Sequence, residues 1–178
     1  MRWFTPVLAL VFTAFGRVSA RPLEQRGGIE YKIYAYGDNI GGLQVYYSDG
    51  IAMISESTDS NETPIYLTVS DSDAYTWVAH PDSSSAAWTT KLLYMASSGT
   101  GEVGFTSSDN TSGKLTDVWW TYGNYVMANV ESATFYAEPV SGSSGVYTLS
   151  WSNVDQSGTN KVLVTLRTIA PSTDSVLS

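Results

Sequence analysis

The 178-residue sequence contains no cysteine and a single histidine, His80. No disulfide can therefore form, although secreted domains of this size often depend on one. A zinc site needs clustered His, Cys or carboxylate ligands, and the run Asp71-Ser72-Asp73 lacks the glycine and the terminal glutamate of a calcium loop. The sequence therefore predicts no metal and no cofactor.

Basic residues are also scarce. The chain has 9 Lys and Arg against 17 Asp and Glu, which gives a formal net charge of −8. An acidic surface repels the phosphates of nucleic acids and of anionic lipids. We therefore expect no nucleic-acid partner and no attachment to a charged membrane surface.

Only one long apolar run is present, and it lies near the N-terminus at residues 4–15, after Arg2. Small residues follow at Val18-Ser19-Ala20, as at a signal-peptidase cleavage site. The pattern predicts a signal peptide over residues 1–20 and a secreted, extracellular protein with no membrane segment after cleavage; an uncleaved N-terminal anchor is the alternative. Residues 21–28 then form a short pro-segment, trimmed after Arg26, or a flexible tail. A single β domain follows at 29–171, with a flexible C-terminal tail at 172–178.

Helical periodicity is missing as well, whereas β-branched and aromatic residues alternate with polar ones in short runs. Ser48-Asp49-Gly50 and Gly123-Asn124 are typical of hairpin turns. The pattern predicts twelve strands, at Ile29–Tyr36, Leu43–Tyr47, Ile51–Ser55, Pro64–Val69, Ala74–Ala79, Lys91–Ala96, Glu102–Ser107, Leu115–Tyr122, Tyr125–Asn129, Ala133–Ala137, Val146–Trp151 and Lys161–Thr168.

The two halves of the domain resemble each other. The order Asp-Asn, Gly, Leu, Val, aromatic pair, Gly, Met occurs over residues 38–53 and again over 109–127. Two six-strand halves of this kind would bury their apolar faces against each other. We therefore predict an all-β fold, a two-sheet β-sandwich of about twelve short strands, with a closed barrel as the alternative.

Alternation along the strands assigns faces to the aromatic residues. Asp117 predicts a solvent-exposed face, which would turn Trp119 outward and Trp120 inward. In the matching strand, Tyr46 would lie beside Gln44 on the outer face, and Tyr47 would lie in the core. Exposed rings beside polar groups are typical of sugar-binding faces. The predicted binding residues are therefore Tyr46, Trp119, Gln44 and Asp117, unless a loop or neighbouring strand covers the rings.

Other residues suggest weaker chemistry. Asn61 and Asn110 begin Asn-x-Ser/Thr sequons and are predicted glycosylation sites. His80 ends a strand, and no nucleophile elbow accompanies it, so we interpret it as a turn residue. A small glycoside hydrolase stays open as an alternative, because acids near strands can pair across a cleft. The acids concerned are Glu102, Glu131 and Glu138.

The segments Ile33–Gly37 and Ile40–Gly50, together with the ending Val164–Ser172, resemble an uncharacterised family of small secreted proteins of filamentous fungi. The resemblance implies a fungal source and an extracellular or cell-wall location, and it transfers no catalytic or binding residue. We predict a non-enzymatic extracellular or cell-wall-associated binding protein that recognises polysaccharide or a host surface protein. The alternatives are a host-directed effector or elicitor of plant responses that contributes to virulence, and the small hydrolase.

Overall fold

The computed structural model describes residues 28–56, 62–156 and 158–172, and these contain strands and no helix. The prediction of an all-β fold is confirmed. The predicted signal peptide and most of the two predicted tails lie outside the described residues. The strands are β1 Tyr34–Gly37, β2 Ile40–Ser48, β3 Ile51–Ser55, β4 Thr63–Val69, β5 Trp77–Pro81, β6 Lys91–Ala96, β7 Thr100–Thr106, β8 Lys114–Leu115, β9 Trp119–Tyr122, β10 Tyr125–Ala128, β11 Thr134–Pro139, β12 Tyr147–Ser152 and β13 Val162–Arg167.

Every predicted strand overlaps an observed one, and the bounds of β3 and β6 agree with the prediction. One predicted strand, Leu115–Tyr122, is divided in two, because the chain is irregular over residues 116–118 between β8 and β9. Both predicted hairpins are present. The turn between β2 and β3 has positive φ angles at Asp49 (47°) and Gly50 (88°), as a tight two-residue turn requires.

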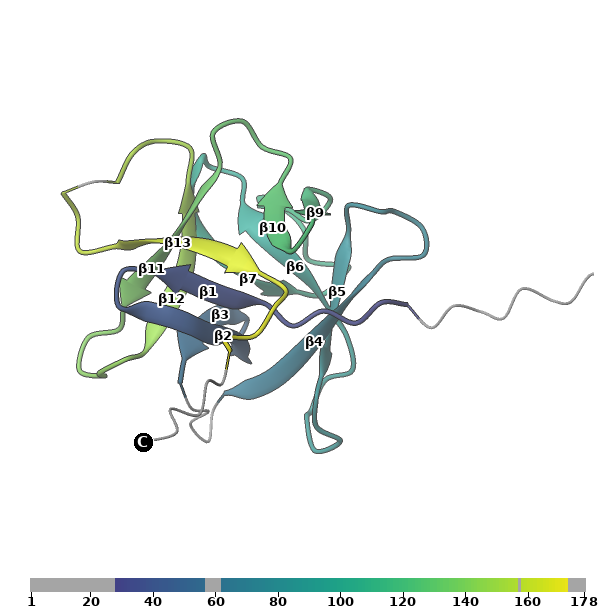
Figure 1. The fold of residues 1–178 in the computed structure, drawn as a ribbon. Coiled ribbons are helices and arrows are strands. Elements are labelled where there is room, and N and C mark those ends of the chain that lie inside the picture. The colour runs from purple at the N-terminus through teal and green to yellow at the C-terminus, as the bar shows by residue number, and fades with distance from the viewer. Residues whose placement is uncertain (1–27, 57–61, 157, 173–178) are drawn as a thin grey trace, which may run out of the picture.

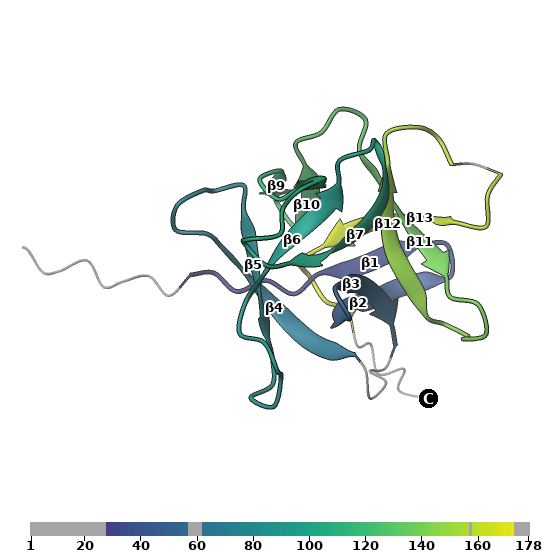
Figure 2. The ribbon, with the colours of Figure 1, turned by 180° about the vertical axis from the view of Figure 1, so that it is seen from behind.

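The prediction of a two-sheet sandwich is wrong. Ten strands follow one another in the order β1-β2-β4-β5-β6-β7-β3-β12-β11-β13, and β1 pairs with β13 to close them into a barrel. Three strands, β8, β9 and β10, lie outside this ring, with β8 on β6 and the β9–β10 hairpin on β13. Figures 1 and 2 show the strands of the ring surrounding a common interior.

The sequence pattern does not distinguish these two architectures. A strand of a sandwich and a strand of a barrel both bury alternate side chains, so their periodicity is the same. The difference is made by long-range pairing, here between Tyr34–Gly37 and residues 164–167. A β-bulge between Ala35 and Tyr36 bends this part of the ring, which helps the sheet to close on itself.

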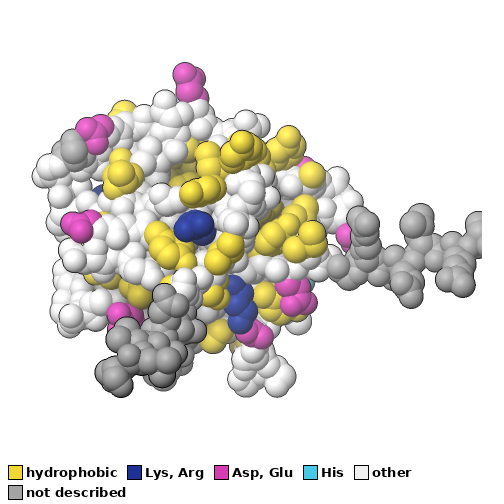
Figure 3. Space-filling model, viewed as in Figure 1, with side chains coloured by type: hydrophobic (Ala, Val, Ile, Leu, Met, Phe, Trp, Pro, Cys, Tyr) yellow, Lys and Arg dark blue, Asp and Glu magenta, His cyan; other side chains and the backbone are white. Residues whose placement is uncertain are grey.

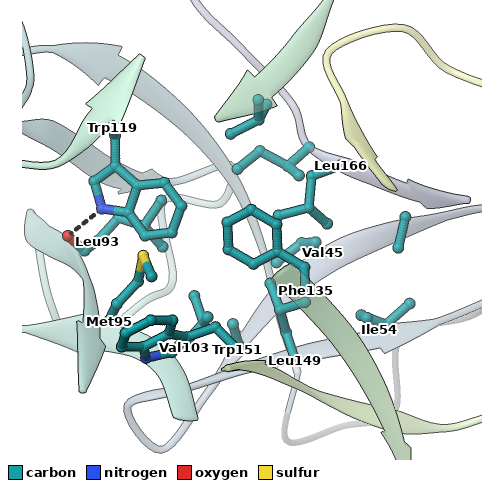
Figure 4. Close-up of a cluster of buried hydrophobic side chains, with 14 of the residues drawn as sticks. Val45, Ile54, Leu93, Met95, Val103, Trp119, Phe135, Leu149, Trp151 and Leu166 are labelled. Carbon is teal, nitrogen blue, oxygen red and sulfur yellow. Dashed lines mark hydrogen bonds between the residues drawn. The ribbon is translucent and has the colours of Figure 1, made fainter. Parts of the chain in front are cut away.

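A single core of apolar side chains fills the barrel (Figure 4). Its largest fully buried members are Trp77, Trp119 and Trp151. The Nε1 atoms of Trp119 and Trp151 donate hydrogen bonds of 3.0 Å to the carbonyl oxygens of Leu93 and Ala96. The indoles are thus held in fixed orientations inside the barrel.

This core contradicts the assignment of faces in the second half of the chain. Trp119 is fully buried and its ring lies 5.9 Å from that of Phe135, whereas Trp120 is 37% exposed. The prediction failed because Asp117 lies before β9 in the irregular segment, so it does not mark a face of the strand. Tyr47, in contrast, is partly buried and packs against the core, in contact with Trp88 and Phe105.

The arrangement of two packed halves is also wrong. β1 of the first half pairs with β13 of the second, and β3 pairs with β12, so the strands of both halves belong to one ring around a single interior. The matched aromatic pairs have different environments, since β2 is a barrel strand and β9 is an edge strand that pairs with β10. Within the described ranges, no helix is long and apolar enough to cross a membrane.

Candidate functional site

The most distinctive surface of the molecule is a row of side chains that crosses five adjacent strands. In this row Tyr122 of β9 pairs with Tyr125 of β10, Tyr125 with Arg167 of β13, Arg167 with Tyr34 of β1, and Tyr34 with Gln44 of β2. Paired residues of neighbouring strands point to the same side of a sheet. With strands about 4.8 Å apart, the four steps of the row span about 19 Å.

Further rings lie along the same strands, two residues from members of the row. Tyr36 follows Tyr34 on β1, and Trp120 precedes Tyr122 on β9, where the two rings meet edge to face at 6.5 Å. Alternate positions share a face, so these rings also point outward. We call this surface the aromatic face; it comprises Tyr34, Tyr36, Trp120, Tyr122, Tyr125 and Arg167.

Several of these rings are accessible to a ligand. The side chain of Tyr122 is 72% exposed, and those of Tyr125 and Trp120 are also exposed. Figure 3 shows hydrophobic side chains gathered over β9, β10, β13 and β1, with a basic side chain among them and acidic side chains around the margin. This exposed group of rings is therefore the candidate functional site of the molecule.

Arg167 lies between two of the rings. Its guanidinium carbon is 5.2 Å from the centre of the Tyr125 ring and 5.3 Å from that of the Tyr36 ring, within the range of a cation–π contact. Its Nε atom is buried and has no hydrogen-bond acceptor among the described residues. Neither of the two ion pairs between described side chains involves it.

Tyr36 is held in place by the backbone on which it rests. Gly42 has a φ of +94°, and a Cβ atom at this position would come within 2.8 Å of the Tyr36 ring. The hydroxyl of Tyr36 donates a hydrogen bond of 2.8 Å to the carbonyl oxygen of Ile169. The ring therefore packs directly against Gly42, and its hydroxyl is bonded to the segment that follows β13.

A hollow of about 380 Å³ adjoins the aromatic face at its β2 end. Gln44 and Tyr46, two of the predicted binding residues, line it together with Tyr34 and Pro171. The Nε2 atom of Gln44 is buried without a hydrogen-bond acceptor. Burial, and after it the charge of Glu62, raises the pKa of the Tyr46 hydroxyl, which therefore stays a neutral donor.

The other two predicted binding residues do not join them. Trp119 is fully buried in the core, which makes the prediction that its ring is available to a ligand wrong. Asp117 is exposed, but it lies before β9, at the far side of the sheet from β2. The sequence analysis missed Tyr34, Tyr36 and Arg167, although aromatic residues two positions apart on β1 were a visible signal.

The acids considered for a hydrolase are separated from one another. Glu102 on β7 accepts a hydrogen bond of 2.5 Å from Tyr94, and Glu138 on β11 forms a 3.0 Å ion pair with Lys161. Glu131 lies in the turn that precedes β11. Among residues 28–56, 62–156 and 158–172, no group of three His, Cys, Asp or Glu residues could hold a metal ion.

A second hollow, of about 460 Å³, lies around Glu102, and several of its polar groups bind one another. The ammonium of Lys114 donates to Thr106 Oγ1 at 2.9 Å and to the carbonyl oxygen of Asn110 at 3.0 Å, and it lies 5.0 Å from the centre of the Tyr94 ring. Burial and the hydrogen bond to Glu102 raise the pKa of Tyr94, so its hydroxyl remains a donor. We interpret this cluster as structural.

The remaining candidate residues lie away from the aromatic face. His80 lies within β5, paired with Tyr66 of β4, so its interpretation as a turn residue is wrong. Its Nε2 atom is 2.9 Å from Thr68 Oγ1 and its ring stacks on Tyr66 at 4.9 Å. Burial lowers its pKa, and Glu30 opposes this in part. Asn110 is exposed in the turn between β7 and β8, and the other predicted glycosylation site, Asn61, lies outside the described residues.

The segments that carried the resemblance are neighbours in space. Tyr34, Tyr36 and Gly42 belong to the opening segments, and Arg167 and Ile169 belong to the ending, so the part of the aromatic face on β1 and β13 is built where these segments meet. Comparison with known proteins adds nothing to this: no family model, no curated protein and no solved structure matches the chain.

Proposed function

We propose that the protein is an extracellular binding protein that attaches to polysaccharide through the aromatic face. The observation that carries the proposal is the row formed by Tyr122, Tyr125, Arg167, Tyr34 and Gln44 across five strands. A tyrosine ring offers a flat apolar surface to the C–H face of a sugar, and its hydroxyl can bond to sugar hydroxyls. The row thus alternates stacking surface with hydrogen-bonding groups.

The length of the row favours a chain of sugars over a single one. At about 19 Å it is longer than one sugar ring, and it is open along the surface. The binding groups also lie on paired β-strands, three of the barrel and two of the β9–β10 hairpin, so they need little rearrangement on binding, which lowers the entropic cost. An extended, preformed and open platform suits a polymer.

Two features of the row favour a sugar over a partner protein. The buried cores of protein interfaces are apolar and well packed, whereas here polar groups separate the rings. Two buried donors without an acceptor, Gln44 Nε2 and Arg167 Nε, lie on either side of Tyr34. The side chains that carry these atoms, an amide and a guanidinium, are only partly buried, and their remaining polar groups can bond to the hydroxyls of a sugar.

The experiment is a depletion assay with insoluble chitin, β-glucan and cellulose, run beside affinity electrophoresis in gels that contain soluble polysaccharides. We expect the mature protein to be depleted or retarded by at least one polysaccharide. Tyr122→Ala removes the most exposed ring of the face and should weaken this binding about tenfold, as expected for the loss of one stacking contact of 1–2 kcal/mol.

Val154→Ala is the matched control, because Val154 is exposed and lies in the connection between β12 and β13, outside the aromatic face. This variant should bind as the parent does. A protein that binds none of the polysaccharides, or a Tyr122→Ala variant that binds as tightly as the parent, would contradict the proposal. A response in leaf tissue without any polysaccharide binding would favour the effector alternative, and release of reducing sugar would favour the hydrolase.

A further inference from the structure

The charge of the aromatic face differs from that of the rest of the molecule. The whole chain has 17 acidic residues, yet none of them lies on β1, β2, β9, β10 or β13. Arg167 is the one charged residue on these five strands. A single positive charge therefore stands in the middle of these five strands, while an acid, Glu56, lines the adjoining hollow at the β2 end.

The contacts of Arg167 leave its positive charge without an acidic partner among the described residues. The rings of Tyr36 and Tyr125 hold the guanidinium from two sides, at 5.3 and 5.2 Å. These contacts fix the plane of the group but satisfy none of its five N–H donors. An arginine that only supported the fold would be expected to donate to a backbone carbonyl or a carboxylate, and its buried Nε atom donates to neither.

We infer that the polysaccharide bound at the aromatic face contains uronic acid units, and that Arg167 binds the carboxylate of one of them. This inference rests on the proposed function. A guanidinium presents paired N–H groups that match the two oxygens of a carboxylate, and such charge-assisted pairs are stronger than neutral hydrogen bonds. The exposed rings of Tyr125 and Tyr122 stack on sugars further along the polymer.

The row also places the groups that a uronic acid unit requires next to each other. Tyr34 lies between Arg167 and Gln44 in the register of β1 with its two neighbours. A sugar stacked on Tyr34 can therefore direct its carboxylate towards Arg167 and its hydroxyls towards Gln44. A neutral polysaccharide would leave the guanidinium unpaired.

The test compares polygalacturonic acid with the same polymer after complete methyl esterification, so that only the charge differs. Binding is measured by affinity electrophoresis and titration calorimetry at about 0.15 M salt, where repulsion beyond about 8 Å is screened. We expect the parent protein to bind the acid at least about tenfold more tightly than the ester. Arg167→Gln should bind both polymers equally and weakly, and Arg167→Lys should recover part of the preference.

Lys91→Gln is the matched control, because it removes one positive charge from the second hollow and leaves the aromatic face intact. It should keep the preference for the acid. Equal binding of the two polymers by the parent would overturn the inference and leave the proposed function standing, whereas binding of no polysaccharide would overturn the proposed function itself. Equally tight binding of poly-glutamate, which has no sugar rings, or an unchanged preference in Arg167→Gln, would also overturn the inference. The comparison of polymers on the parent protein remains valid should a variant fail to fold.

Discussion

The guanidinium of Arg167 lies 5.3 Å from the centre of the Tyr36 ring, and this contact joins the last strand of the barrel to the first. The two residues also lie on strands that pair through their backbones. The closure of the barrel therefore brings together the residues of the aromatic face on β1 and β13, and the β9–β10 hairpin adds the remaining rings. Changes that disturb the seam between β1 and β13 should affect both stability and binding.

Gly42 gives the first prediction. A Cβ at this position would meet the Tyr36 ring at 2.8 Å, and its φ of +94° is unfavourable for alanine. We expect Gly42→Ala to lower the free energy of unfolding by about 2 kcal/mol, from strain and displaced packing. Urea titration measures this, with Gly41→Ala as control, because nothing lies within 4 Å of a Cβ at Gly41. Equal effects of the two substitutions would contradict this account of Gly42.

The neighbouring tryptophans of β9 give the second prediction. Trp119→Phe should lower the free energy of unfolding by about 2 kcal/mol, because it leaves a cavity and removes the hydrogen bond to Leu93. Trp120→Phe should change stability by no more than about 0.5 kcal/mol, since this ring is at the surface. Thermal unfolding of both variants measures the difference, and the reverse order would mean that β9 faces the other way.

His80 gives a prediction about pH. Burial lowers the pKa of its ring in the folded protein below the ordinary value of 6.5, so the unfolded chain binds more protons in the interval between the two pKa values. Stability therefore rises with pH across this interval. The contribution of His80 is complete above about pH 6.5 and is lost as the pH falls below that value.

The chain has one histidine, which makes this prediction simple to test. NMR titration of the single imidazole should give a pKa below that of a histidine in an unstructured peptide. The midpoint of urea unfolding should be lower at about pH 5.5 than at about pH 7.5, and His80→Gln should reduce this difference. A titration at the ordinary pKa would show that the ring is not desolvated.

Asn110 gives the last prediction. The residue is exposed in the turn between β7 and β8, so a glycan attached there would project into solvent. We expect a protein secreted from a eukaryotic host to carry a glycan at this position, and Asn110→Gln to lose the corresponding mass. Mass spectrometry before and after glycosidase treatment measures this, with Asn124→Gln as control, because Asn124 is not in a sequon. An unchanged mass in Asn110→Gln would rule out occupancy in that host.

The local structure was predictable because it depends on neighbours in the chain. The strands β3 and β6 were predicted with their observed bounds, and the turn at Asp49 and Gly50 has the positive φ angles that its residue types favour. The prediction failed where the chain is irregular. Between β8 and β9 the in–out alternation of side chains is interrupted, so the outward position of Asp117 does not predict which way Trp119 and Trp120 point.

The sequence by itself determined an all-β chain of short strands with an acidic surface and one run of apolar residues near its start, because periodicity, turn residues and charge act over a few neighbouring positions. Only the tertiary structure decided that the strands close into a barrel and that Tyr34, Arg167 and Tyr125 share one surface. The closure depends on pairing between residues more than a hundred positions apart along the chain, and Tyr125 also reaches Arg167 from a separate hairpin. Such pairing is selected by the packing of the whole core, and no local pattern records it.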